Sequence, residues 1–238
     1  MQETPKKFNL TCSTPASHKG HFLTRLEFFS SLRHHQAKLP VLVWIHGGFL
    51  QFGSSHSLIG PSGHLAHKLN VVLISINYRL HALGFLALEL LSNSGPNSAR
   101  GNYGLWDQLA SLNWIKNNIE SFGGDANAIT LAGSDGSAGT ILALASNTFL
   151  TGNLFQKAWL IGPALYANKT YEMVASKNLH NFQARSGCYN VTCLRALSPQ
   201  KVTKLFLGSD DPAFRINDQN DLPIQGIFPE QLINIDGK

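Results

Sequence analysis

The 238-residue sequence predicts an α/β fold with a mostly parallel central sheet and helices on both of its faces. Short, continuous apolar runs bounded by proline or glycine recur along the chain, as in strands buried on both faces. Stretches with apolar residues at helical spacing lie between these runs, and alternating strands and helices are typical of parallel sheets. The 43% hydrophobic and 14% charged composition indicates a globular chain rather than a disordered one.

The apolar runs predict four strands, and the segments between and after them predict five helices. The strands are expected at 40–46, 71–76, 128–132 and 157–161. The helices are expected at 64–69, 105–119, 138–146, 171–185 and 199–206. The clearest helix is amphipathic, because apolar residues recur on one face at Leu105, Leu109, Leu112, Ile115 and Ile119.

Residues 1–38 show neither the period of 2 residues typical of a strand nor that of 3.6 typical of a helix, so they are expected to form an irregular leader. Residues 39–238 are then expected to form one incomplete domain. The leader carries six Lys or Arg against Glu3 and Glu27, so +4 of the net charge of +5 lies there. A solvated basic leader is favoured over polyanion binding, because no nucleic-acid motif accompanies the charge. No apolar run is long enough to span a bilayer, and the start does not resemble a signal peptide.

Two of the three cysteines, Cys188 and Cys193, bracket the short loop Cys-Tyr-Asn-Val-Thr-Cys. No second ligand pair accompanies them, so no metal site is predicted. Glycosylation sequons stand at Asn9, Asn168 and Asn190. Because one sequon falls inside a loop that a disulfide could close, the sequence favours an extracellular or secretory-pathway glycoprotein.

An ordered series of motifs runs along the predicted domain. It comprises Val-Trp-Ile-His-Gly-Gly (43–48), Ile-Asn-Tyr-Arg-Leu (76–80), Gly-Asn-Tyr-Gly-Leu-Trp-Asp-Gln (101–108), Phe-Gly-Gly-Asp (122–125), Ile-Thr-Leu-Ala-Gly (129–133) and Gly-Asn-Leu-Phe-Gln-Lys-Ala (152–158). In this order the motifs resemble the type-B carboxylesterase/cholinesterase family of α/β-hydrolases over roughly residues 39–230. The resemblance implies an α/β-hydrolase fold, a carboxylic ester as the substrate of active members, no cofactor, and a disulfide between Cys188 and Cys193.

The resemblance also places the oxyanion hole, in which backbone N–H groups hold the negative oxygen of the reacting ester. The equivalent residues are Gly47, Gly48 and Phe49. Phe49 takes the place of a third glycine, so its side chain is expected to disfavour the backbone angles that aim the N–H. Losing one such donor typically lowers the rate by about 10²–10³.

The arginine of the Asn-Tyr-Arg motif lies inside the fold in this family. An unpaired guanidinium would be very unfavourable there. The resemblance therefore implies a structural ion pair between Arg79 and Asp107, with no part in chemistry.

The nucleophile of the family stands in Gly-x-Ser-x-Gly, at a sharp turn between a strand and a helix. The equivalent stretch here, residues 133–139, is Gly-Ser-Asp-Gly-Ser-Ala-Gly, and we call it the elbow. Counting ten residues on from Asp125 puts Asp135 at the tip of the elbow. This register is favoured because placing Ser137 there needs a two-residue insertion in a tight segment. Ser137 stays the catalytic candidate of the other register, since counting back from the downstream motif does not decide.

A base for either residue is not evident. After Ser137 the chain has one histidine, His180, and one carboxylate between them, Glu172. Their spacing puts both on one face of a helix, whereas a triad draws its members from separate loops. The acid and histidine motifs of the family are not found, and the family's strand before residues 43–48 has no match in the leader.

The leading hypothesis is therefore a non-catalytic member of the family, similar in kind to neuroligin, gliotactin or thyroglobulin-type domains. Such a member would act in binding or adhesion, with an extracellular protein as partner. One alternative is an active carboxylic-ester hydrolase that uses Ser137, with its acid and histidine outside this chain. The other is a truncated fragment without function.

Overall fold

The computed structural model describes residues 6–13, 23–30, 38–56, 60–92, 100–163 and 170–207. The chain divides into two compact units. The first comprises Met1–Gly48, Phe52–Tyr78 and Asp107–Leu165, and the second comprises Phe49–Gln51, Arg79–Trp106 and Tyr166–Lys238. Each unit is thus made of three separate stretches of the chain, so no single position in the sequence divides the two units.

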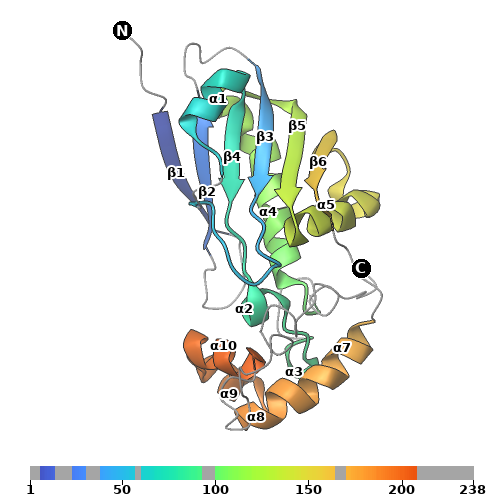
Figure 1. Cartoon of the computed structure of the whole chain (residues 1–238). Helices are drawn as coiled ribbons and strands as arrows, with labels where there is room; N and C mark the ends of the chain where they lie inside the picture. Colours follow the sequence, from blue (N-terminus) through green and yellow to red (C-terminus); the bar gives the residue numbers. More distant parts are fainter. Residues whose placement is uncertain are drawn as a thin grey trace. The chain divides into compact units, whose positions relative to one another are not determined.

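The first unit is built on a six-stranded sheet in the order β1-β2-β4-β3-β5-β6 (Figure 1). Its strands are β1 Lys6–Ser13, β2 Leu23–Ser30, β3 Leu39–Ile45, β4 Val72–Ile76, β5 Gly124–Ser134 and β6 Lys157–Ile161. The last four strands are parallel, and β2 pairs antiparallel with both β1 and β4. The mostly parallel sheet confirms the predicted fold class, and all four predicted strands are present.

The first two strands fall in the stretch expected to be an irregular leader, so that expectation is wrong for residues 6–13 and 23–30. β2 lies between β1 and β4, and its residues 26–29 are all buried. A strand buried on both faces shows no alternation of polar and apolar residues. Pairing with β4 therefore fixes β2, and the local sequence pattern does not reveal it.

Helices connect the strands and build the second unit. The first unit contains α1 Gly63–Leu69, most of α4 Tyr103–Asn118, η2 Ile119–Phe122, α5 Gly136–Ser146 and α6 Thr148–Thr151. The second contains α2 His81–Phe85, α3 Glu89–Ser92, α7 Tyr171–Asn178, η3 Leu179–Gln183, α8 Ala184–Ser186, α9 Val191–Ala196 and α10 Pro199–Leu207. All five predicted helices are found. The sequence missed α2, α3, α6 and α9, because none exceeds 6 residues and so none shows a clear period.

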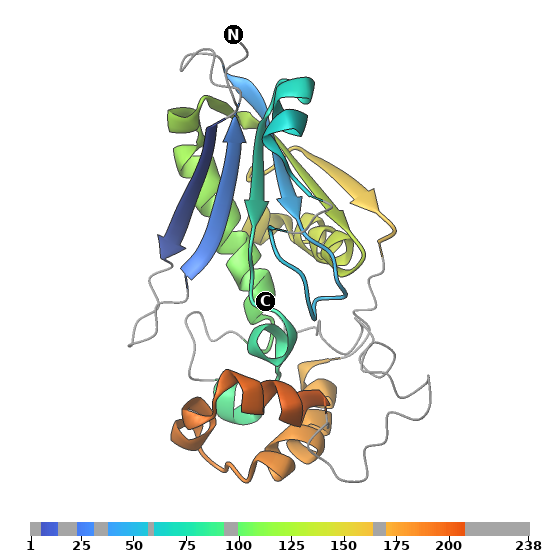
Figure 2. The ribbon, with the colours of Figure 1, turned by 60° about the vertical axis from the view of Figure 1, so that its left-hand side comes forward.

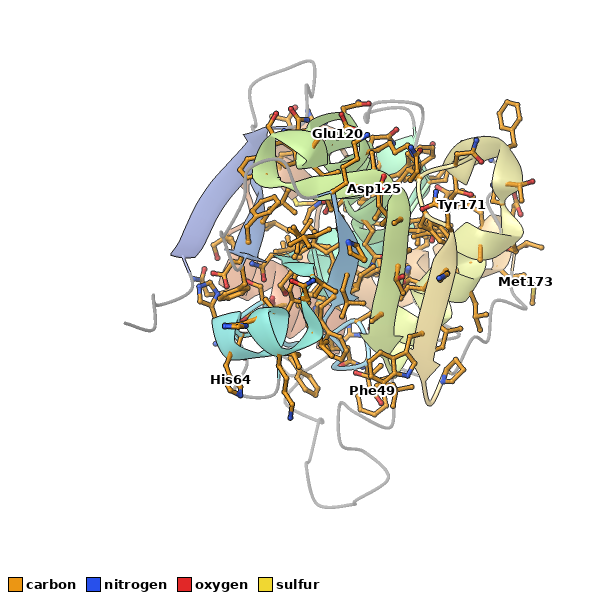
Figure 3. All side chains as sticks on the ribbon, turned by 90° about the horizontal axis from the view of Figure 1, so that it is seen from above. Phe49, His64, Glu120, Asp125, Tyr171 and Met173 are labelled. Atoms are coloured by element: carbon orange, nitrogen blue, oxygen red, sulfur yellow. A yellow bond between two sulfur atoms is a disulfide. The ribbon has the colours of Figure 1, made fainter. Side chains whose placement is uncertain are left out.

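The helices α1 and α4 lie on opposite faces of the sheet (Figure 2). Phe29 clusters with Ala66 of α1, and Phe28 meets Trp114 of α4 with 5.7 Å between ring centroids. Successive residues of a strand point to opposite faces, so the two contacts bury both sides of β2. Figure 3 shows the same arrangement from above, with His64 of α1 and Glu120 of η2 on opposite sides.

The second unit has a separate apolar core. Its buried members are Ala82, Leu86, Leu88, Phe182, Cys188, Leu194 and Leu205. Cys188 is disulfide-bonded to Cys193 with a Cα–Cα distance of 5.4 Å, as the family resemblance implied. Within the described ranges, no helix is long and apolar enough to cross a membrane.

Candidate active site at the elbow

Asp135 occupies the tip of the elbow, between β5 and α5. Its φ of 53° and ψ of −126° lie in a region that residues other than glycine rarely adopt. The backbone N–H of Asp135 donates to Ile161 O at 3.1 Å, and its carbonyl accepts from Gly139 N at 3.2 Å. This turn leaves the side chain of Asp135 exposed beyond the carboxyl end of β5, where ligands bind in open α/β sheets.

Ser137 lies beneath the tip, in the first turn of α5, and is fully buried. Its Oγ lies 2.8 Å from Ile45 O and 2.7 Å from Ser134 O, and it accepts from Ser134 N at 3.0 Å. The one hydroxyl proton is thus shared between two main-chain carbonyls. The Oγ of Ser137 therefore faces the ends of β3 and β5 rather than solvent.

Two glycines, Gly47 and Gly48, follow β3, and we call them the glycine pair; Gly47 is the one that faces the elbow. A Cβ atom at Gly47 would lie only 2.8 Å from Asp135 Oδ2 and 2.6 Å from Ser134 Oγ, so no side chain fits there. Gly48 has a φ of 108°, and its carbonyl accepts from Phe52 N at 3.2 Å, which closes a tight turn. The loop expected to bind an oxyanion therefore lies directly against the carboxylate of Asp135.

Phe49 follows the glycine pair with a φ of 54°, and Leu50 has a φ of 62°. Both residues keep a backbone conformation suited to glycine, which costs an ordinary residue about 1–2 kcal/mol. The backbone at Phe49 thus retains the left-handed geometry in spite of its side chain, which is 37% exposed. The substitution adds bulk and strain without straightening the loop.

His46 precedes the glycine pair and is buried. Its ring stacks on Tyr78 with 4.8 Å between centroids, and the Tyr78 hydroxyl donates to His46 O at 3.0 Å. Burial lowers the pKa of His46, and a hydrogen bond between Nδ1 and Gly47 O opposes this. His46 is therefore neutral at physiological pH and serves to pack the start of the loop.

A polar network that the sequence did not suggest anchors the other end of this loop. The carboxylate of Glu27, buried in β2, lies 2.5 Å from His56 Nε2. His56 Nδ1 is 3.2 Å from Ser55 Oγ, and Asn77 joins Ser55 through hydrogen bonds of 2.7 and 2.9 Å. The one available signal was Glu27 inside the apolar run Leu-Glu-Phe-Phe, because a buried carboxylate needs a partner.

The other predicted site residues are divided between the two units. Arg79, in the second unit, donates from Nη2 to Tyr103 O at 3.3 Å and lies over the Tyr103 ring. Asp107 is buried and belongs to the first unit, so the ion pair between Arg79 and Asp107 stays a prediction. Glu172 and His180 are both exposed on the helical run 171–186.

The three sequons have different surroundings. Asn9 lies in β1, and Asn168 lies outside the described residues. Asn190 is the N-cap of α9, where its Oδ1 accepts from Cys193 N at 2.8 Å. Glycosylation of these residues stays a prediction. The described ranges hold no group of three or more His, Cys, Asp or Glu that could bind a metal ion.

Comparisons with known proteins show which family has this fold and these motifs. A model of the carboxylesterase family matches residues 14–222. The chain belongs to this family. A carboxylesterase of Geobacillus stearothermophilus matches this family member with a TM-score of 0.69 and 30% identity, over 87% of this chain and 43% of that one.

Relatives of this carboxylesterase-family chain include several esterases. Fumonisin B1 esterase of Sphingopyxis macrogoltabida is 42% identical over 53% of this chain and 23% of the relative. Acetylcholinesterase-1 of Trittame loki is 37% identical over 71% of this chain and 32% of its own length. Carboxylesterase 5A of Ovis aries is 34% identical over 81% of this chain and 52% of its length. The chain thus spans about half or less of these relatives.

Proposed function

We propose that this carboxylesterase-family chain has lost ester hydrolysis at its elbow and acts as a binding domain. The observation that carries the proposal is the exchange of positions at the elbow, where Asp135 forms the exposed tip and Ser137 is buried beneath it. A serine-based mechanism needs an accessible hydroxyl beside a base. The hydroxyl of Ser137 instead contacts two main-chain carbonyls.

The charge of Asp135 also opposes the chemistry of the family. Hydrolysis develops negative charge on the ester oxygen, and the oxyanion loop stabilises it with N–H dipoles. The carboxylate of Asp135 already lies against Gly47. A second negative charge beside it would be repelled, which raises the barrier to reaction.

An aspartate nucleophile would need a base to hydrolyse the covalent ester. In the described part of the chain, neither Asp135 nor Ser137 forms a hydrogen bond with a histidine. Binding, by contrast, requires only the retained fold. The disulfide at Cys188 and the sequon at Asn190 favour an extracellular setting, so we infer an extracellular protein as the partner.

A fluorophosphonate probe tests the proposal, because it labels activated serines covalently. The chain is treated with the probe, digested with trypsin and mapped by mass spectrometry. We expect no label on the peptide 117–157, which carries the whole elbow. Label on this peptide that disappears in Ser137→Ala would contradict the proposal. An active carboxylesterase treated in parallel shows that the probe is competent.

A second variant, Asp135→Ser, separates the tip from the rest of the site. It returns a hydroxyl to the tip of the elbow. If the probe labels Asp135→Ser and does not label the parent chain, Asp135 is the residue that prevents reaction at the elbow, in line with the proposal. Binding is then measured by surface plasmon resonance against a panel of extracellular domains, and binding to none of them would contradict the binding role.

A further inference from the structure

We propose that Asp135 and Gly136 form a site of spontaneous covalent modification, at which the elbow closes to a succinimide and opens to isoaspartate. The proposal rests on backbone geometry and the identity of two residues. It is independent of whether the domain binds a partner or hydrolyses an ester.

The backbone of Asp135 is already in the conformation that ring closure needs. The five-membered ring contains Gly136 N and the Cγ, Cβ, Cα and C atoms of Asp135, so Gly136 N must eclipse Cβ about the Cα–C bond. Because N and Cβ are about 120° apart around a tetrahedral Cα, this requires a ψ of about −120°. The ψ of Asp135 is −126°. Helices, with ψ near −42°, and strands, with ψ near +135°, are both far from this value.

The attacking amide and the carboxyl group are both available. Gly136 is the first residue of α5, and the first N–H groups of a helix have no partner within it. As a glycine it has no side chain to hinder attack by its nitrogen. The side chain of Asp135 is exposed and makes no capping hydrogen bond to α5.

The reaction balances without an added reagent. The nitrogen of Gly136 bonds to Cγ of Asp135 and loses its proton, and the carboxyl group loses hydroxide, so that one water leaves. Water then adds to either carbonyl of the ring. Opening at one carbonyl restores aspartate, and opening at the other leaves Gly136 attached through Cγ as isoaspartate.

Other aspartates in the described ranges lack this combination. Asp125 lies in β5, precedes alanine and accepts from Asn127 N at 2.8 Å. Asp107 is buried within α4. The sequence has a second Asp-Gly pair, Asp236 and Gly237, outside the described residues, which serves as an internal reference.

The test compares isomerisation in the folded chain with that in the same chain unfolded in urea. Both are incubated in mildly acidic buffer and digested, and isoaspartate is assigned by electron-transfer fragmentation and by isoaspartyl methyltransferase. We expect isoaspartate at Asp135 to form on the order of tenfold faster in the folded chain, the factor that about 1.4 kcal/mol of pre-organisation supplies. An equal or slower rate in the folded chain would overturn the proposal.

Two variants keep the test independent of stability. Asp135→Glu retains the carboxylate but would need a six-membered ring, so no product is expected at that position. Asp135→Asn closes the same ring with loss of ammonia and is expected to convert to aspartate and isoaspartate faster than the parent isomerises. If Asp135→Asn stays intact while the fold is retained, the geometry does not promote closure. The fluorophosphonate labelling of peptide 117–157 is measured separately, on protein that has not been incubated, so that the two tests do not affect each other.

Discussion

Several residues other than glycine have a positive φ, which is a strained backbone conformation for a residue with a side chain. Asp135 and Phe49 carry this conformation at the elbow and beside the glycine pair, and His81 carries it at the start of α2. Such strain persists only where the surroundings impose it, and it clusters at functional sites. In this chain such strain is present at the tip of the elbow, at Asp135, while Ser137 lies buried beneath it.

His81 predicts a pH dependence of stability. The side chain of His81 is buried, and this burial lowers its pKa from 6.5 to about 4. Between these values the unfolded chain binds a proton that the folded chain does not, so stability falls as the pH falls from 6.5 to 4. The expected loss is roughly 3 kcal/mol in the free energy of unfolding.

Urea unfolding at a series of pH values measures this loss. The variant His81→Gln keeps a polar side chain of similar size and cannot titrate, so its profile should be flatter by the same amount. Parallel profiles for the parent and the variant would show that His81 does not cause the loss.

At the scale of elements, Ser137 joins the start of α5 to the ends of β3 and β5. Ser137→Ala should lower the free energy of unfolding by about 1–3 kcal/mol, because it removes the hydrogen bonds between the buried Ser137 Oγ and main-chain groups of Ile45 and Ser134. Ser146 is the matched control, since it bonds Ala143 O at the exposed end of the same helix. Ser146→Ala should change stability by less than about 0.5 kcal/mol.

The two variants are compared by chemical denaturation. Equal, small effects of both substitutions would mean that Ser137 does not hold the elbow to the sheet.

The elements that the sequence predicted well are those with a long pattern of their own. The parallel strands are continuous apolar runs, and α4 has four turns of regular spacing. Asp135 could be placed at the tip by counting residues from Asp125, because a strand that ends in a tight turn does not readily accommodate inserted residues. The network of Glu27 and His56 could not be predicted, since it joins two segments that only the pairing of β2 with β4 brings together.

At the scale of the whole molecule, the sheet ends in β6, whose outer edge pairs with no strand among the described residues. Trp159 and Ile161 of β6 are 58% and 45% exposed, and Phe149 of α6 is 95% exposed. Open edges and apolar surface of this kind promote association. We expect the 238-residue chain alone to bind a hydrophobic dye and to elute as aggregates in size-exclusion chromatography. A dye-silent monomer that unfolds cooperatively on heating would contradict this.

The same exposed edge gives the molecule an optical reporter. Trp159 of β6 is more than half exposed, whereas Trp44, Trp106 and Trp114 are half-buried. An indole in water emits at longer wavelength and is reached by iodide. A polypeptide bound along β6 would therefore shift the fluorescence emission of Trp159 to shorter wavelength and protect the indole from quenching by iodide. No label needs to be added to the chain.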